Sequence, residues 1–309
     1  MSSNRSSGPP SPPGEGLAWL LLGVCTWLLV GFGALVRARQ AGLACPDWPL
    51  CFGAVIPDVR LQGVIYEFGH RALAGLIALA FATLAWRAWR GAAARSQLRK
   101  LLLAAAVVLL LQIVMGGLTV LIVARPAGAA ARPAAWTVTT HLILGNAFAA
   151  LVFAVGMRLR RGVVLAPRAT VIWRGLLALW SVSLAAQFLL GGVVAANLAG
   201  LVCIEFPTCS GGIWFPSWAG MMGIQLLHRV NGVALVALGV GLAWSAGRGP
   251  HSGLSRLLAV AALLQVALGA ANIWFALPPA VTVGHSAVAS LLFVATGLIW
   301  DDRLRRDPA

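Results

Sequence analysis

The sequence has few charged residues, and acids are the scarcest of them. Only 10% of its 309 residues are charged, against roughly a quarter in a soluble domain, and 60% are hydrophobic. Eight residues are Asp or Glu. A chain with so few charged side chains cannot cover a water-exposed surface, which excludes an ordinary soluble protein. The composition indicates a protein of the lipid bilayer.

Eight apolar stretches are long enough to cross a hydrocarbon core of about 30 Å as helices. The first is too long for a signal peptide and follows a Pro/Ser/Gly-rich tail with a single Arg, so we expect a retained helix. The sequence therefore predicts an all-α membrane protein with eight transmembrane helices. They are expected near residues 17–36, 66–86, 101–123, 137–157, 172–196, 220–243, 256–276 and 281–300.

The formal net charge of +15 does not indicate a nucleic-acid partner, because the basic residues alternate by side of the membrane. With the N-terminus in the cytoplasm, sixteen Lys and Arg residues fall on the cytoplasmic side and five on the other. The positive-inside rule then places both termini in the cytoplasm. We expect a multi-pass protein of the cell membrane.

The chain contains an internal repeat. The sequence "AGLACPDWPLCFG" at 41–53, here called the first cysteine loop, matches "AGLVCIEFPTCSG" at 199–211, the second cysteine loop. The same offset of 158 carries His70 onto His228, and "LLQIVMGG" at 110–117 resembles "LLQVALGA" at 263–270. This pattern predicts two tandem four-helix bundles, a parallel repeat. The expected boundaries are a cytoplasmic tail at 1–16, bundles at 17–157 and 172–300, a cytoplasmic linker at 158–171 and a tail at 301–309.

The orientation places both cysteine loops outside the cell, where thiols oxidise. Cys45 with Cys51, and Cys203 with Cys209, are therefore candidate disulfides. A redox-active dithiol and a metal-binding pair are alternatives, although neither loop holds a further Cys or His as a ligand. Cys25, in the middle of the first helix, is interpreted as a small apolar residue.

Four of the five histidines lie about one turn inside the outer end of an even-numbered predicted helix: His70, His141, His228 and His285. One histidine in a membrane helix usually hydrogen-bonds to a neighbouring helix. Four at equal depth, two per repeat, indicate bis-histidine haem sites between the helices. Zinc or copper would be left with unfilled coordination.

Charged residues close to these histidines are candidate members of the same predicted haem sites. Arg71 and Arg229 directly follow a histidine in each repeat and are candidate partners of haem propionates, or else reach the outer headgroups. The halves differ at Glu67, which Gln225 replaces in the second repeat. A carboxylate one turn from a haem ligand is a candidate catalytic group. The alternative is that it favours the helix dipole by about 0.3–1 kcal/mol.

The motifs "CPDWPLC", "EFGHR" and "LLHRVNG", with the histidines of the fourth and eighth predicted helices, resemble the haem A synthase family from about residue 17 to 300. The resemblance implies a membrane oxidoreductase that oxidises the C8 methyl group of haem O to a formyl group by successive hydroxylation. It also implies haem b as cofactor on His228 and His285, and the substrate haem on His70 and His141. Glu67 would be the catalytic carboxylate, and the cysteine pairs structural or redox-active.

Two other functions are compatible with the residues alone. A di-haem membrane cytochrome that exchanges electrons with quinol would explain four histidines, but gives no reason for the change from Glu67 to Gln225. A transporter with parallel repeats would use its histidines to carry protons. For the synthase, the expected partners are haem O, membrane lipid, an electron partner of unknown identity, and, as candidates, a haem O synthase and terminal oxidase assembly factors.

Overall fold

The computed structural model describes residues 14–91, 96–125, 131–161, 170–249 and 251–304. Within these ranges it contains eight helices that are long and apolar enough to cross a membrane, which confirms the predicted fold class. Most of the predicted tails and part of the linker lie outside the described residues. The helices are α1 (Glu15–Ala38), α2 (Val64–Arg90), α3 (Ser96–Leu121), α4 (Ala135–Arg161), α5 (Val171–Ala196), α6 (Gly220–Ala246), α7 (Ser252–Trp274) and α8 (Pro279–Leu304).

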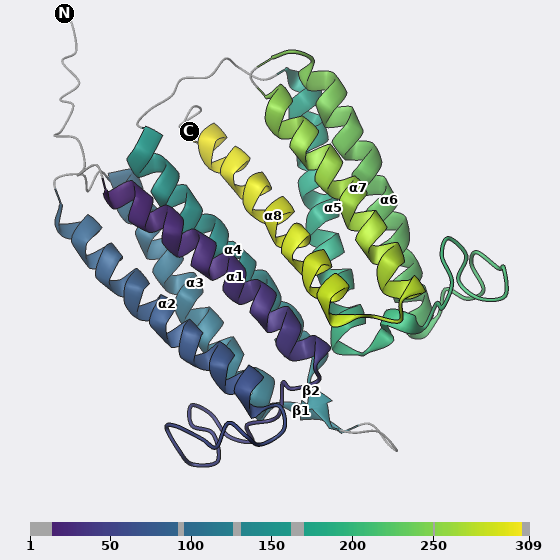
Figure 1. The fold of residues 1–309 in the computed structure, drawn as a ribbon. Coiled ribbons are helices and arrows are strands. Elements are labelled where there is room, and N and C mark those ends of the chain that lie inside the picture. Colours follow the sequence, from purple (N-terminus) through teal and green to yellow (C-terminus); the bar gives the residue numbers. More distant parts are fainter. Residues whose placement is uncertain (1–13, 92–95, 126–130, 162–169, 250, 305–309) are drawn as a thin grey trace, which may run out of the picture.

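The helices form two groups in chain order, α1–α4 and α5–α8 (Figure 1). Helix α8 joins them, because it packs against α1 and α4 as well as against α7. This arrangement is consistent with two tandem bundles. The first described turn of α1 and the last of α8 lie at the same end of the molecule, and both cysteine loops lie at the other, here called the loop end (Figure 1).

The apolar cores of the two groups lie towards the end opposite the cysteine loops. In the first group, Trp19 is fully buried and packs edge-on against Phe81, which in turn contacts Phe148. In the second, the buried Trp180 donates from its indole Nε1 to Thr296 Oγ1 at 2.9 Å and so connects α5 with α8. These contacts fix the helices of each group to one another at the end opposite the cysteine loops.

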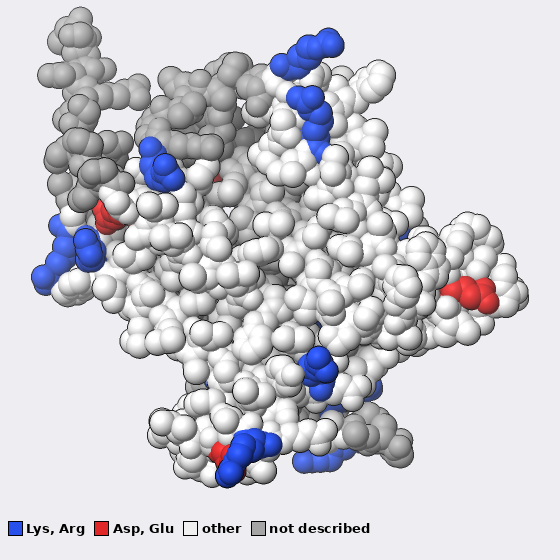
Figure 2. Space-filling view, viewed as in Figure 1, with Lys and Arg blue, Asp and Glu red and all other residues white. Residues whose placement is uncertain are grey.

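The two groups are not packed identically. Helix α2 packs mainly against α1 and hardly touches α3, whereas its counterpart α6 packs along both α5 and α7. At the end opposite the cysteine loops, an ion pair between Arg158 of α4 and Asp301 of α8 connects the two groups. In the space-filling view, Lys and Arg lie towards the two ends and a broad band between them is almost free of charge (Figure 2). That band suits a hydrocarbon environment.

The segment between α3 and α4 contains an element that the sequence analysis did not predict. Strands β1 (Val123–Ala124) and β2 (Arg132–Pro133) form a short antiparallel pair. Arg132 donates to the backbone carbonyl of Asn197 at 3.0 Å, at the end of α5. A single helical turn, η1 (Ala199–Leu201), follows α5 at this point. The hairpin therefore contacts the second group at the loop end.

Candidate functional site

The four histidines predicted as ligands lie on α2, α4, α6 and α8, within the first three turns of each helix. They fall into two pairs, because α2 and α4 carry His70 and His141 in the first group of helices, and α6 and α8 carry His228 and His285 in the second (Figure 1). Each pair therefore belongs to one repeat. The fifth histidine, His251, precedes α7 and stacks on Trp173 with ring centroids 4.6 Å apart, apart from these pairs.

Each of these imidazoles packs against a glycine of the preceding helix. A Cβ atom on Gly33 would lie 3.1 Å from Cε1 of His70, and one on Gly191 would lie 3.0 Å from Cε1 of His228. The corresponding distance is 3.1 Å from Gly116 to His141 and 3.5 Å from Gly269 to His285. Glycine is thus used where the backbone of one helix must approach a histidine ring of the next.

One nitrogen of each ring has no partner. The Nδ1 atoms of His70, His141, His228 and His285 are buried and make no hydrogen bond within the described chain. A buried polar atom without a partner is costly, and natural proteins rarely retain one without a reason. All four histidines share this buried, unpartnered Nδ1 atom, and each ring faces a glycine. This arrangement fits two sites, in each of which two imidazoles bind one metal macrocycle. The residues present therefore suit haem.

Glutamines contact three of the histidines, a feature that the sequence analysis missed. The side-chain nitrogen of Gln112 lies 3.3 Å from Nε2 of His141, and that of Gln187 lies 3.4 Å from Nε2 of His228. Gln265 donates to the backbone carbonyl of His285 at 2.9 Å. Gln112 and Gln265 occupy the same place in the repeated "LLQ" motif, which could have indicated them.

The second repeat surrounds its histidine with a polar network that the first lacks. Asn231 donates to Gln187 Oε1 at 2.7 Å and to the carbonyl of Ser183 at 2.9 Å, and Ser183 donates back to Asn231 Oδ1 at 2.8 Å. Gln187 donates to the backbone carbonyl of His228 at 3.1 Å. At the offset of 158, the first repeat has Cys25, Leu29 and Leu73 in place of Ser183, Gln187 and Asn231. The His228 site is therefore braced by hydrogen bonds, and the corresponding positions of the first repeat hold residues that cannot form this network.

Both predicted disulfides are present, Cys45–Cys51 and Cys203–Cys209, and all four cysteines are buried. In each cysteine loop, a carboxylate accepts hydrogen bonds from backbone N–H groups at the loop's far end. Asp47 accepts from the backbone N–H groups of Phe52 and Gly53, and Glu205 from those of Gly211 and Gly212. The bond from Gly53 holds the pKa of Asp47 below its usual value, and the bond from Gly212 does the same for Glu205, so both remain ionised near neutral pH.

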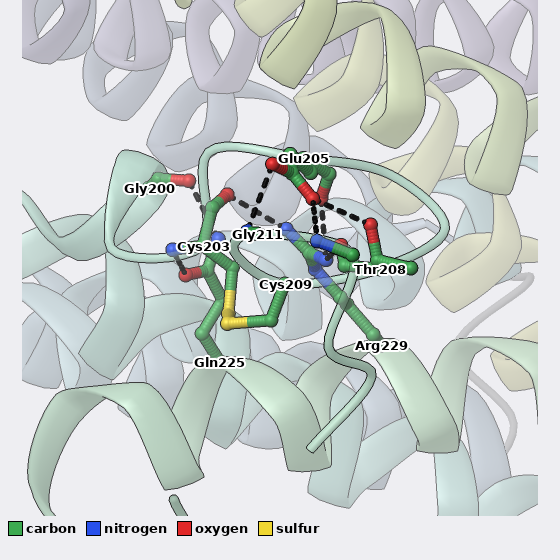
Figure 3. The surroundings of a disulfide bond; sticks show 9 residues. Gly200, Cys203, Glu205, Thr208, Cys209, Gly211, Gln225 and Arg229 are labelled. Atoms are coloured by element: carbon green, nitrogen blue, oxygen red, sulfur yellow. Dashed lines mark hydrogen bonds between the residues drawn. A yellow bond between two sulfur atoms is a disulfide. The ribbon is translucent and has the colours of Figure 1, made fainter. Parts of the chain in front are cut away.

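Arg71 and Arg229 hold the two cysteine loops in the same way. Arg71 donates from Nη1 to the carbonyls of Asp47 and Leu50, at 2.8 and 2.7 Å. Arg229 donates from Nη1 to those of Glu205 and Thr208, both at 2.8 Å, and from Nη2 to that of Cys203 (Figure 3). The predicted propionate-binding arginines therefore also anchor the loops to α2 and α6.

Glu67 and Gln225 tie the same loop position to the helix. Glu67 accepts from the backbone N–H of Cys45 at 2.9 Å, and Gln225 accepts from that of Cys203 at 2.8 Å. Both side chains are buried. The two side chains differ in the contact made by their second terminal atom. Oε1 of Glu67 pairs with Arg71 at 2.5 Å, whereas Nε2 of Gln225 donates to the carbonyl of Gly200 at 2.6 Å. Glu67 thus combines a negative charge with a loop contact, and Gln225 keeps the contact alone.

Within the described ranges, no group of three or more His, Cys, Asp or Glu residues could hold a single metal ion. The cysteines of the loops pair with each other, and Cys25 is a free thiol exposed on the surface of α1. The metal-binding alternative for the cysteine pairs therefore has no support from further ligands nearby.

Comparison with known sequences gives a consistent result. Residues 17–296 match the model of the COX15-CtaA family, described as cytochrome oxidase assembly protein. A protein named Heme A synthase from Shewanella oneidensis is 28% identical over 90% of this chain and 94% of its own length. Proteins of the same name from Halalkalibacterium halodurans and Alkalihalophilus pseudofirmus are 29% and 30% identical, over 84% and 85% of this chain and 87% and 88% of their own lengths.

Proposed function

The chain belongs to the COX15-CtaA family of cytochrome oxidase assembly proteins, and within that family we propose that it oxidises the C8 methyl group of haem O to the formyl group of haem A. The broader role follows from its relatives named Heme A synthase: it is a membrane oxidoreductase that acts in haem A synthesis, with haem O as substrate. The observation that supports the reaction most strongly is that the two histidine pairs have matching glycine contacts but different polar surroundings.

The two repeats are assigned different tasks. We assign haem b, as resident cofactor, to His228 and His285 of the second bundle, because the network through Gln187 and Asn231 would hold one ligand in a fixed orientation. Haem O is assigned to His70 and His141 of the first bundle. There α2 packs loosely against α3, and Leu29 and Leu73 replace the polar network, which suits an apolar molecule that must enter and leave.

The reaction requires two hydroxylations of one carbon. Written with water as the oxygen source, each converts C–H into C–OH and releases two protons and two electrons, and the electron partner takes up the electrons. The geminal diol then loses water to give the aldehyde. Haem b, when bound, supplies one-electron redox chemistry beside the substrate site. Glu67 is the proposed catalytic carboxylate: its negative charge would stabilise positive charge at the rim of the substrate or guide a proton or water there. Arg71 would hold that carboxylate in place.

The proposal is tested by expressing the protein together with a haem O synthase in a host that makes no haem A. Extracted pigments are separated and identified by mass. Haem A, or its hydroxylated precursor, is expected only when the protein is present. Haem b is expected in the purified protein. Absence of both haem A and the precursor, with haem O available, would contradict the proposed reaction.

A di-haem cytochrome that exchanges electrons with quinol is the second candidate, and the matching glycine positions at Gly33 and Gly191 favour it, since they suit the same haem in both halves. The same experiment separates the two, because a cytochrome would yield two haem b per chain and no haem A. A proton transporter would bind no haem.

The proposed location is the cell membrane, with both termini in the cytoplasm and both cysteine loops outside. The loops would then meet an oxidising compartment, which suits two disulfides. An electron partner is required by the stoichiometry of the reaction, and a haem O synthase and terminal oxidase assembly factors are proposed as protein partners.

A further inference from the structure

Not every arginine at the loop end holds a cysteine loop. Arg37 lies in the last turn of α1, and its side chain is partly buried. Within the described part of the chain its guanidinium makes no hydrogen bond or ion pair. The other described arginines near this end that are withdrawn from water have partners: Arg71 and Arg229 hold the cysteine loops through their terminal nitrogens, and Arg132 donates to Asn197. Only Nε of Arg229 is buried without a partner among these three. A guanidinium inside a membrane protein is costly and implies a partner.

The position of Arg37 relates it to the second bundle rather than to its own. Helix α1 packs against α8: Trp27 donates to the carbonyl of Ala287 at 3.1 Å, and Gly31 lies against Val283. Arg37 lies six residues beyond Gly31 on α1, towards the loop end, where α8 begins. A guanidinium of the first repeat therefore lies on a helix that packs against α8, which carries His285.

Comparison of the two repeats indicates that the fold does not require an arginine at the position of Arg37. The glycine four residues earlier is duplicated, as Gly33 and Gly191, but at the offset of 158 the counterpart of Arg37 is Ala195. The second bundle forms the same loop and the same histidine contact without an arginine there. The fold of the repeat unit therefore does not require this guanidinium.

We propose that Arg37 binds a propionate carboxylate of the haem held by His228 and His285, so that the cofactor of the second bundle is bound in part by the first. This inference rests on the assignment of haem b to that pair. A planar guanidinium suits a carboxylate because it can donate two parallel hydrogen bonds. Its positive charge would also disfavour the ferric state, so its removal is expected to lower the reduction potential of that haem.

The test compares Arg37→Gln with Arg37→Lys, and Arg39→Gln serves as the matched control, since Arg39 lies two residues on and has its guanidinium over the ring of Tyr66. The readouts are haem b per purified protein and the reduction potential of the bound haem. Arg37→Gln is expected to retain several-fold less haem, with a lower potential, Arg37→Lys to be intermediate, and Arg39→Gln to match the unchanged protein. Unchanged haem content and potential in Arg37→Gln would overturn the proposal.

A second measurement compares two ligands on the same protein sample, so a smaller fraction of folded variant does not change the ratio of their affinities. The haem-depleted unchanged protein is titrated with iron protoporphyrin IX and with its dimethyl ester, which lacks the carboxylates. The ester should bind more weakly, on the order of tenfold, as expected for loss of a hydrogen bond to a charged group. In Arg37→Gln the difference should shrink. Equal preference in both proteins would overturn the role of Arg37, whereas an unchanged protein that binds no haem at all would overturn the proposed function as well.

Discussion

Glu67 and Gln225 accept the same hydrogen bond from their cysteine loops, so an exchange between them changes charge more than shape. We predict that Glu67→Gln keeps the first loop and the bound haem b but lowers the yield of haem A about a hundredfold, as for loss of an acid–base group. The measurement is haem A per protein after coexpression with a haem O synthase. Gln225→Glu is the matched control and should leave the yield nearly unchanged. Full activity in Glu67→Gln would show that Glu67, like Gln225, serves only to hold a loop.

The glycines that face the histidines give a second prediction at this scale. A methyl group on Gly191 would lie 3.0 Å from His228, whereas one on Gly269 would lie 3.5 Å from His285, at ordinary contact distance. Gly191→Ala should therefore displace the His228 ring and lower haem b content several-fold, while Gly269→Ala should not. The ratio of the haem absorbance to the protein absorbance of purified samples measures this. Equal haem content in the two variants would mean that the His228 ring can move aside at no cost.

Individual residues were predictable where the repeat marks them. The four histidines and the four cysteines recur at matching positions, and chemistry limits what such groups can do. The glycines and glutamines beside the histidines were not predicted, because their role depends on which face of one helix meets the next. The second use of Arg71 and Arg229, as anchors of the loop carbonyls, depends likewise on the path of a loop. Such a path cannot be read from apolar periodicity.

Between elements, the contrast of α2 with α6 accounts for the proposed division of tasks. Asn231→Leu would give α6 the residue that α2 has at Leu73, and would leave Gln187 Oε1 and Ser183 without their partner. Loss of such buried bonds typically costs about 1–3 kcal/mol. We predict a lower thermal unfolding temperature and faster loss of haem b in detergent. Leu73→Ala, a change on the exposed face of α2, should alter neither. Identical haem loss in both variants would contradict a bracing role for the network.

At the same scale, the sequence predicted the existence of all eight helices but not their partners. Long apolar stretches define spans because each must satisfy its backbone inside the hydrocarbon. Nothing in these stretches indicates that α8 packs on α1 and α4, or that α2 stands away from α3. The hairpin of β1 and β2 was missed because strands of two residues carry no periodic signal. Helix–helix partners depend on small residues and shape, which many positions in this chain could supply.

At the scale of the molecule, the charge distribution predicts how the protein sits in the membrane. In a Cys25→Ser background, Ile56→Cys introduces an exposed thiol near the first cysteine loop, and Arg248→Cys introduces one after α6, at the opposite end. A maleimide that cannot cross membranes should label Ile56→Cys in intact cells, and should label Arg248→Cys only after lysis. The reason is that the arginine-rich connections remain in the cytoplasm during insertion. The reverse labelling pattern would place the cysteine loops in a reducing compartment and would remove the ground for disulfides in the cell.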